Sequence, residues 1–412
     1  MSGYRLPKHK HMSMNSLEMC NVPKKVYIPL ISGNDTKMNP LVKIGEYVEK
    51  GQILARRRGT FETPIFSSVS GYVMEIKEMR HQSGAKVKCL VIDNDLRERK
   101  RYKKKEVKTK KEFVELLKEC GIVGMGGAGF PTYFKYNTDE KVETLLINAV
   151  ECEPYITADW QIIMEKCELI LEAIDKILKI NNIKEAVFAI KKTNTEAIEE
   201  IKKYIGTYPK IKLKEVRNIY PMGWERTLIK EALNLEYDRL PIEKGIIVNN
   251  VSTIYAIYEA LNEGKPLFER IITVTGEGVK KPCNCLVKVG TKVSDILTLL
   301  GGKHANTIII AGGPMMGSEA LNNLVVTPEL NCILVLPKKE QCLEKNCLRC
   351  GKCEMVCPAG LIPVLIKDNL GNKENLNKLN VNKCISCGLC SYICPSNIDV
   401  RDKVNQAKME VK

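Results

Sequence analysis

The sequence lacks any apolar run close to the roughly 20 residues that a membrane-spanning helix requires. Its N-terminus, MSGYRLPKHKHM, has no apolar segment of the kind found in a secretory signal peptide. Aromatic residues make up only 6% of the chain. We therefore expect a cytoplasmic protein whose contact with a membrane, if it has one, is peripheral.

Positive charge is abundant and unevenly distributed. The formal net charge is +15, and basic residues cluster at 56–58 and at 97–111. Few aromatic residues are interleaved with these runs and no recognition motif accompanies them, so we expect no binding of nucleic acid. The stretch 97–111 fits a solvated linker, or a docking patch for an acidic partner or an anionic membrane surface. The chain of 412 residues is long enough for roughly two to four domains.

Eight of the 17 cysteines form two quartets with one spacing, C-x2-C-x2-C-x3-C-P. This spacing is typical of [4Fe–4S] ligation, in which three close thiolates hold one cluster and the fourth ligates the other. Zinc sites instead favour two separated CxxC pairs. A role in single-electron transfer follows. We predict one cluster on Cys347, Cys350, Cys353 and Cys394, and the other on Cys384, Cys387, Cys390 and Cys357.

The first quarter of the chain predicts a small β module after a polar start. Residues 1–24 are polar and are expected to be loose. From 25 to 96 the sequence consists of short apolar strands separated by glycine turns at Gly45, Gly51 and Gly71. The basic stretch 97–111 then marks a boundary.

A glycine-rich loop, GMGGAG at 124–129, satisfies the pattern G-x-G-x-x-G. The dinucleotide fingerprint of the Rossmann fold needs a strand directly before it, whereas here an amphipathic helix precedes the loop. Bare backbone amides can still approach a phosphate closely. Pro131 is suited to begin a following helix, and Lys135 would add a positive charge. Close packing without a ligand is the alternative.

Residues 112–265 predict an α/β domain, because buried strands recur with a polar turn and a helix after each. The strands are expected at 145–149, 186–190 and 245–248. Polar residues follow them, where sheets of this kind place ligands. These polar residues could bind a ligand or act as ordinary helix caps.

Four motifs in this order, GMGGAGFPTYFK, NAVECEPYITAD, YPMGWERTL and VNNVST, resemble the flavoprotein subunit of respiratory complex I. The whole chain from 25 to 400 is still more similar to the RnfC subunit of the Rnf electron-transport complex.

Residues 25–96 resemble the lipoyl and biotinyl barrel-sandwich modules. The connection between Ala55 and Pro64 has no lysine to carry a swinging arm, so we interpret this module as structural.

The resemblance implies a multidomain α/β protein. Its expected order is a loose N-terminus (1–24), a β barrel-sandwich (lipoyl-like) module (25–96), a basic linker (97–111), an α/β FMN/NADH-binding domain (112–265), a β-grasp (SLBB-like) module (266–338) and a helical dicluster ferredoxin domain with two [4Fe–4S] clusters (339–412). In the β-grasp module, Cys283 and Cys285 would share one face of a strand and could pair. Two unpaired thiols are the favoured interpretation.

The resemblance also implies the residues of the FMN and NADH site. These are Gly124, Gly126, Gly127, Ala128, Gly129, Phe130, Lys135, Asn148, Glu151, Glu153, Tyr220, Gly223, Glu225, Asn249, Asn250 and Thr253. Phe130 would stack near the nicotinamide or the adenine. Three departures from the family pattern stand out: Val150 and Trp224 replace acidic residues of complex I, and LISGNDTKMNP replaces a stretch usual in Rnf subunits.

The function implied is oxidation of NADH through FMN, with single electrons passed through the two clusters to other Rnf-type membrane subunits. Ferredoxin would be an indirect partner, and the protein would lie peripherally on the cytoplasmic face of the cell membrane. One alternative is a soluble relative that supplies a dedicated reductase of the proline or cobalamin type. Another is a non-catalytic electron relay whose flavin and nucleotide site no longer functions because of Val150 and Trp224.

Overall fold

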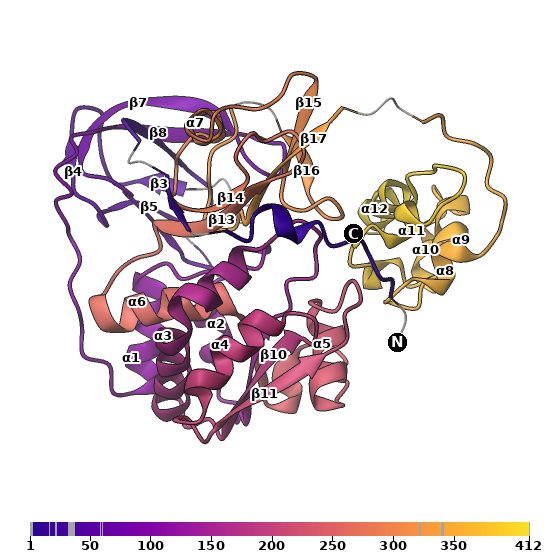
Figure 1. Cartoon of the computed structure of the whole chain (residues 1–412), viewed down its shortest axis with the longest axis horizontal. Helices are drawn as coiled ribbons and strands as arrows, with labels where there is room; N and C mark the ends of the chain where they lie inside the picture. Colours follow the sequence, from indigo (N-terminus) through magenta and orange to yellow (C-terminus); the bar gives the residue numbers. More distant parts are fainter. Residues whose placement is uncertain are drawn as a thin grey trace.

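The computed structural model describes residues 3–15, 17–20, 23–31, 38–57, 59, 61–320, 323–338 and 342–411. Three modules form the larger body, and a small helical domain lies beside it (Figure 1). The stretch 30–40, which departs from the Rnf pattern, falls partly outside the described residues. No helix in the described part of the chain is both long and apolar enough to cross a membrane.

The first module is a barrel-sandwich of two small sheets, with strand orders β2-β8-β7-β4 and β3-β5-β6. Its apolar core, which includes Val26, Leu54 and Ile92, fills the space between them. Gly71 is required where β7 meets β8, because a Cβ there would lie 1.8 Å from the carbonyl oxygen of Asp93. The strands are β2 (Lys25–Pro29), β3 (Met38–Pro40), β4 (Tyr47–Val48), β5 (Ile53–Arg57), β6 (Pro64–Phe66), β7 (Gly71–Arg80) and β8 (Lys86–Asn94).

The basic segment after β8 is extended, largely exposed and irregular, and it runs along the barrel-sandwich module. The backbone of Lys50 forms hydrogen bonds with Arg99 and Arg101 on this segment. The following helix begins at Lys110, inside the expected linker, because Thr109 and Glu112 form a capping box.

The flavin-type domain has a four-stranded parallel sheet of order β11-β10-β9-β12. Alternate residues of β9 point to opposite faces, so Leu145 packs with α1, α3, α4 and α6 while Leu146 packs with α5. The elements are α1 (Lys110–Glu119), α2 (Thr132–Tyr136), β9 (Thr144–Ala149), α3 (Ala158–Ile180), β10 (Glu185–Lys191), α4 (Thr195–Ile205), β11 (Ile211–Val216), α5 (Glu225–Leu233), η2 (Pro241–Lys244), β12 (Ile246–Asn250) and α6 (Val251–Glu263).

The β-grasp module is a six-stranded mixed sheet of order β1-β14-β13-β17-β15-β16, with α7 packed into its core. Its first strand comes from the N-terminal segment and pairs in parallel with β14. The elements are η1 (Lys10–Met12), β1 (Glu18–Met19), β13 (Glu269–Thr275), β14 (Cys283–Lys288), α7 (Val293–Leu299), β15 (Thr307–Ala311), β16 (Ser318–Ala320) and β17 (Cys332–Pro337).

The prediction that residues 1–24 are loose is wrong for the described part of that segment. The backbones of Tyr4 and Tyr220 exchange hydrogen bonds of 2.8 and 2.9 Å, and the carbonyl of Lys8 accepts one from Tyr155. Asn284 on β14 donates to the carbonyl of Ser13. Polarity misled the prediction because the segment is held by hydrogen bonds to its backbone, which require no apolar side chains.

In its described residues the C-terminal domain contains helices joined by irregular segments and no strand, in agreement with the predicted helical domain (Figure 1). Its core is small and includes Ile366, Leu376 and Val404. The helices are α8 (Lys352–Met355), α9 (Pro363–Asp368), α10 (Lys373–Lys378), η3 (Val381–Lys383), α11 (Leu389–Tyr392) and α12 (Val400–Glu410).

Candidate functional site

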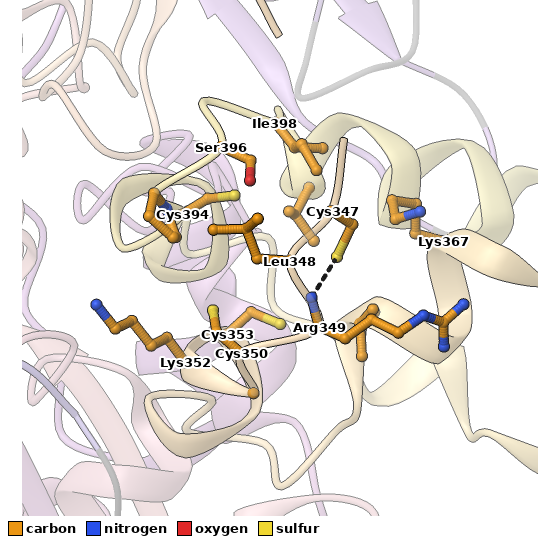
Figure 2. A pocket seen from close by; sticks show the side chains of 14 residues that line it. Cys347, Leu348, Arg349, Cys350, Lys352, Cys353, Lys367, Cys394, Ser396 and Ile398 are labelled. Carbon is orange, nitrogen blue, oxygen red and sulfur yellow. Dashed lines mark hydrogen bonds between the residues drawn. The ribbon is translucent and has the colours of Figure 1, made fainter. Parts of the chain in front are cut away.

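Two cavities in the C-terminal domain are each lined by four cysteines, three from one quartet and one from the other. One is lined by Cys347, Cys350, Cys353 and Cys394, which Figure 2 shows around a common space. The other is lined by Cys357, Cys384, Cys387 and Cys390. These are the two sets expected from the spacing. In the described part of the chain, no three His, Cys, Asp or Glu side chains are close enough to hold one ion. Four cysteines around each cavity match the donor set of a cubane cluster, whose thiolate ligands stand apart around four irons.

The chain makes the same turn around both cavities. The backbone amide of Arg349 points to the sulfur of Cys347 at 3.4 Å, and that of Ser386 points to the sulfur of Cys384 at 3.3 Å. Arg349 and Ser386 both have positive φ angles, 51° and 56°. A glycine follows the second cysteine of each quartet and begins a short helix, α8 or α11. Amides aimed at sulfur stabilise a thiolate, so both turns suit cluster ligation.

Several of the predicted flavin-site residues lie where β9 and β12 end and α5 and α6 begin. The amide of Met125 in the glycine loop donates to Thr253 Oγ1 at 3.0 Å. Lys135 donates to the carbonyl of Val248 at 2.6 Å and lies 3.9 Å from Glu225. Its burial lowers its pKa, an effect that Glu225 partly offsets. A positive charge and two helix N-termini thus stand beside the loop.

The outer surface of the glycine loop is open. Residues 126–128 and Phe130 are exposed, and no atom lies within 4 Å of a Cβ added at Gly127. At the other end of the loop, Glu329 of the β-grasp module lies against Gly129, where an added Cβ would be 2.7 Å from Oε1. An exposed backbone with two glycines and an alanine fits a phosphate-bearing ligand such as FMN or a dinucleotide.

The side-chain amides of several predicted site residues form hydrogen bonds within the protein. Asn148 donates to the carbonyl of Gly223 at 2.9 Å, and Asn249 donates to the hydroxyl of Tyr136 at 2.6 Å. Asn250 caps α6 and also donates to Asp159 at 2.7 Å. These amides therefore hold the strand ends and helix starts in place around the loop.

Glu151 is buried and is held from the N-terminal segment. Its Oε2 atom pairs with the Nζ atom of Lys10 at 3.1 Å, and its Oε1 atom accepts from the amide of Asp159 at 2.9 Å. Lys10 and Lys191 both donate to its backbone carbonyl. Burial raises the pKa of Glu151 to about 7, against the opposing effect of Lys10. Burial also lowers the pKa of Lys191 to about 8.

Glu153 and Tyr220 face the cluster domain. Glu153 accepts hydrogen bonds from the amides of Met315 and Met316 at 3.1 and 2.9 Å, and its burial raises its pKa to about 7. The hydroxyl of Tyr220 donates to the carbonyl of Cys387 at 2.7 Å. Arg401 of α12 donates to the carbonyl of Met315 at 2.6 Å. The loop at 312–317 therefore joins three modules, a role that its glycine-rich sequence did not reveal.

The two departures from complex I have different surroundings. Val150 is buried in the apolar cluster beneath the sheet with Met222 and Leu228, so its side chain belongs to the core. Trp224 is the N-cap of α5. In the β-grasp module, Cys283 and Cys285 are buried free thiols whose sulfur atoms lie 3.4 Å apart.

Comparison with known proteins follows the same module order. The RnfC barrel sandwich hybrid domain matches residues 1–97, the Nuo51 FMN-binding domain 117–259, the SLBB domain 271–319 and the 4Fe-4S dicluster domain 346–398. The chain is 34% identical over 382 residues to a subunit of the proton-translocating ferredoxin:NAD(+) oxidoreductase complex of Clostridium ljungdahlii, covering 89% of this chain and 82% of that protein. This chain belongs to the RnfC family. It is an electron-transfer oxidoreductase subunit with an FMN-binding domain and two [4Fe–4S] clusters.

A second relative supports membership of the RnfC family, and a solved structure supports the fold. The corresponding subunit of the Na(+)-translocating ferredoxin:NAD(+) oxidoreductase complex of Acetobacterium woodii is 32% identical over 359 residues, covering 84% of this chain and 81% of that one. A crystal structure of an NAD+-reducing [NiFe]-hydrogenase in the air-oxidized state shares the fold, with a TM-score of 0.52 and 15% identity. This chain spans 63% of the hydrogenase chain, and 74% of this chain is covered.

Proposed function

We propose that this protein oxidises NADH at the flavin site and passes single electrons through its two clusters to other subunits of an Rnf-type complex. Ferredoxin would be the distant partner, and the protein would lie on the cytoplasmic face of the membrane. The names of the relatives from C. ljungdahlii and A. woodii describe ferredoxin:NAD+ oxidoreductases. The observation that carries the proposal is the hydrogen bond from Tyr220 to the carbonyl of Cys387, which ties the flavin domain to a cluster ligand.

The flavin domain offers a place for FMN at the glycine loop. FMN, when bound, accepts two electrons together and releases them singly, which one-electron clusters require. Gly126, Gly127 and Ala128 would receive the phosphate, and Lys135 would balance its charge. Asn148 and Asn250 hold the strand ends that border the site.

The two cysteine sets differ in exposure, and this supports an order for electron flow. Cys387 is buried against Tyr220 and Met315, whereas Cys347 and Cys350 are exposed. We assign the set that contains Cys387 to electron entry from the flavin domain. The set that contains Cys347 lies at the surface and suits transfer to a partner.

The test is to purify the protein without oxygen, measure its FMN and iron, and then add NADH. We expect the flavin band to bleach first and the cluster absorbance to follow. Protein that contains FMN but is not reduced by NADH would contradict the proposal and leave the non-catalytic relay. Val150 gives that alternative no support, because its side chain lies in the core.

Replacing Lys135 with methionine should weaken FMN retention about tenfold or more, because a charge-assisted hydrogen bond to an anion contributes about 1.5–3 kcal/mol. The flavin-to-protein ratio after dialysis measures the effect, and the iron content should be unchanged. Lys141→Met is the matched control, since Lys141 is on the surface and pairs with Glu143 at 2.8 Å. Equal flavin loss in both variants would contradict a role for Lys135.

Replacing Tyr220 with phenylalanine should slow reduction of the clusters while leaving reduction of the flavin unchanged. The substitution leaves the carbonyl of Cys387 without its 2.7 Å hydrogen bond at a buried contact, at a cost of about 1–3 kcal/mol. Stopped-flow spectra after mixing with NADH separate the two steps. Tyr392→Phe is the control, because that ring is 48% exposed. Unchanged cluster reduction in Tyr220→Phe would remove this contact from the electron path.

A further inference from the structure

Three phenylalanine rings gather beside the glycine loop, and one of them comes from the barrel-sandwich module. The centroid of Phe61 lies 5.6 Å from that of Phe130 and 5.2 Å from that of Phe134. Phe130 and Phe134 lie 5.8 Å apart. Both remain open to solvent, with exposed fractions of 37% and 41%. This apolar surface therefore stands next to the open amides of the loop.

The hairpin that carries Phe61 is fixed to the flavin domain by charge. Glu62 pairs with Lys118 of α1 at 3.0 Å and with Arg56 of its own hairpin at 3.3 Å. These contacts lower the pKa of Glu62, with the hydrogen bond from Lys118 as the main cause. The guanidinium of Arg57 lies 5.5 Å from the ring centre of Phe61. Phe61 is thus held beside Phe130, with positive charge next to it.

The position of this hairpin within its module is informative. It is the connection where the related lipoyl modules carry their modified lysine, and here it has no lysine. A structural module has no need to direct this connection toward a redox site. The structure nevertheless brings its only aromatic residue to the rim of the glycine loop.

We propose that Phe61, with Phe130 and Phe134, forms the stacking platform for the adenine ring of NAD(H), so that the barrel-sandwich module is part of the nucleotide site. This inference rests on the proposed function and extends it to residues outside the flavin domain. Planar bases stack on exposed aromatic rings and cover them from water. The diphosphate of the same ligand would then lie beside these rings, outside the amides that receive the FMN phosphate, with Arg57 adding favourable charge.

The experiment measures binding of ADP-ribose, the dinucleotide without its nicotinamide, to the FMN- and cluster-loaded protein by calorimetry. We expect Phe61→Ala to weaken binding about tenfold, in line with the contribution of one base stacked on an aromatic ring. Phe61→Trp should restore the affinity. Met74→Ala is the matched control, because Met74 lies on β7 of the same module and is 48% exposed. Flavin and iron content should be equal in all variants.

A second measurement uses reduced nicotinamide mononucleotide, which has no adenine. Phe61→Ala should raise the KM for NADH about tenfold and leave flavin reduction by the mononucleotide unchanged. Unchanged affinity for ADP-ribose in Phe61→Ala, or equal losses with NADH and the mononucleotide, would overturn the inference. So would no binding of ADP-ribose to the wild type while NADH still reduces the flavin, because the adenine would then have no site on these rings. Failure of NADH to reduce the wild-type flavin would instead contradict the proposed function.

Discussion

Cys387→Ser should reduce the iron content of the purified protein to about half and stop electron transfer out of the flavin, while the FMN content stays at the wild-type level. Cys387 lines the cavity that it shares with Cys357, Cys384 and Cys390, so its loss removes one of four ligands. This cavity lies against the flavin domain through Tyr220. With the entry cluster gone, the outer cluster should remain oxidised when NADH is added.

Iron analysis and low-temperature EPR measure this effect. Cys342→Ser is the control, because Cys342 is exposed and belongs to neither quartet. The same spectra test the crossed ligand sets. Cys394→Ser should remove the same EPR signal as Cys350→Ser, and Cys357→Ser should remove the same signal as Cys384→Ser. If Cys394→Ser instead matched Cys384→Ser, the crossed arrangement would be wrong.

Lys10→Met should destabilise the folded protein by about 3–5 kcal/mol at pH 8, because it removes one partner of a buried ion pair. Lys10 is bonded to Glu151 and to the carbonyl of Ile156, and both side chains of the pair are largely buried. The segment that contains Glu151 borders the flavin site. We therefore expect FMN to be lost at a lower temperature in this variant.

The effect should depend on pH in a defined direction. The pKa of Glu151 is about 7 in the folded protein, above its usual 4.5. The stability that Glu151 contributes is fully present below pH 4.5 and is lost as the pH rises through about 7. Removal of Lys10 raises the pKa further. The loss of stability should therefore be larger at pH 8, where Glu151 of the wild type is ionised beside Lys10, than at pH 6, where Glu151 is mostly protonated in both proteins.

Thermal unfolding of wild type and variant at both pH values tests this prediction. Lys8→Met is the matched control, since Lys8 is an exposed neighbour whose described contact with Tyr155 is made by its backbone. The double variant Lys10→Met, Glu151→Gln should recover part of the stability, because no buried charge is then left without its partner. A destabilisation of the same size at pH 6 and pH 8 would show that packing, and not charge, explains the role of Lys10.

Local sequence patterns predicted much of this structure. Three of the four strands of the flavin domain follow from apolar runs, although β11 was not predicted, and the cysteine sets follow from spacing. In each case the informative residues are close in sequence. Contacts between residues far apart in the sequence could not be recognised from local patterns. Lys10 and Glu151 are 141 residues apart. Phe61 lies in a hairpin whose sequence suggested only a missing lysine, and Met315 lies in a glycine-rich loop whose sequence did not indicate its contacts. These contacts depend on how the modules pack against one another, and local sequence patterns do not indicate that packing.

The N-terminal segment has a consequence for the order in which the protein assembles. Residues 4–13 leave the ribosome before the partners described above, which include Glu151, Tyr155, Tyr220 and Asn284. Residues 4–13 therefore remain in contact with solvent until more than half of the chain has been synthesised. Until Lys10 docks, the carboxylate of Glu151 has no close counter-charge from this segment. Completion of the flavin site is then a late event of biosynthesis, although the part that completes it is made first.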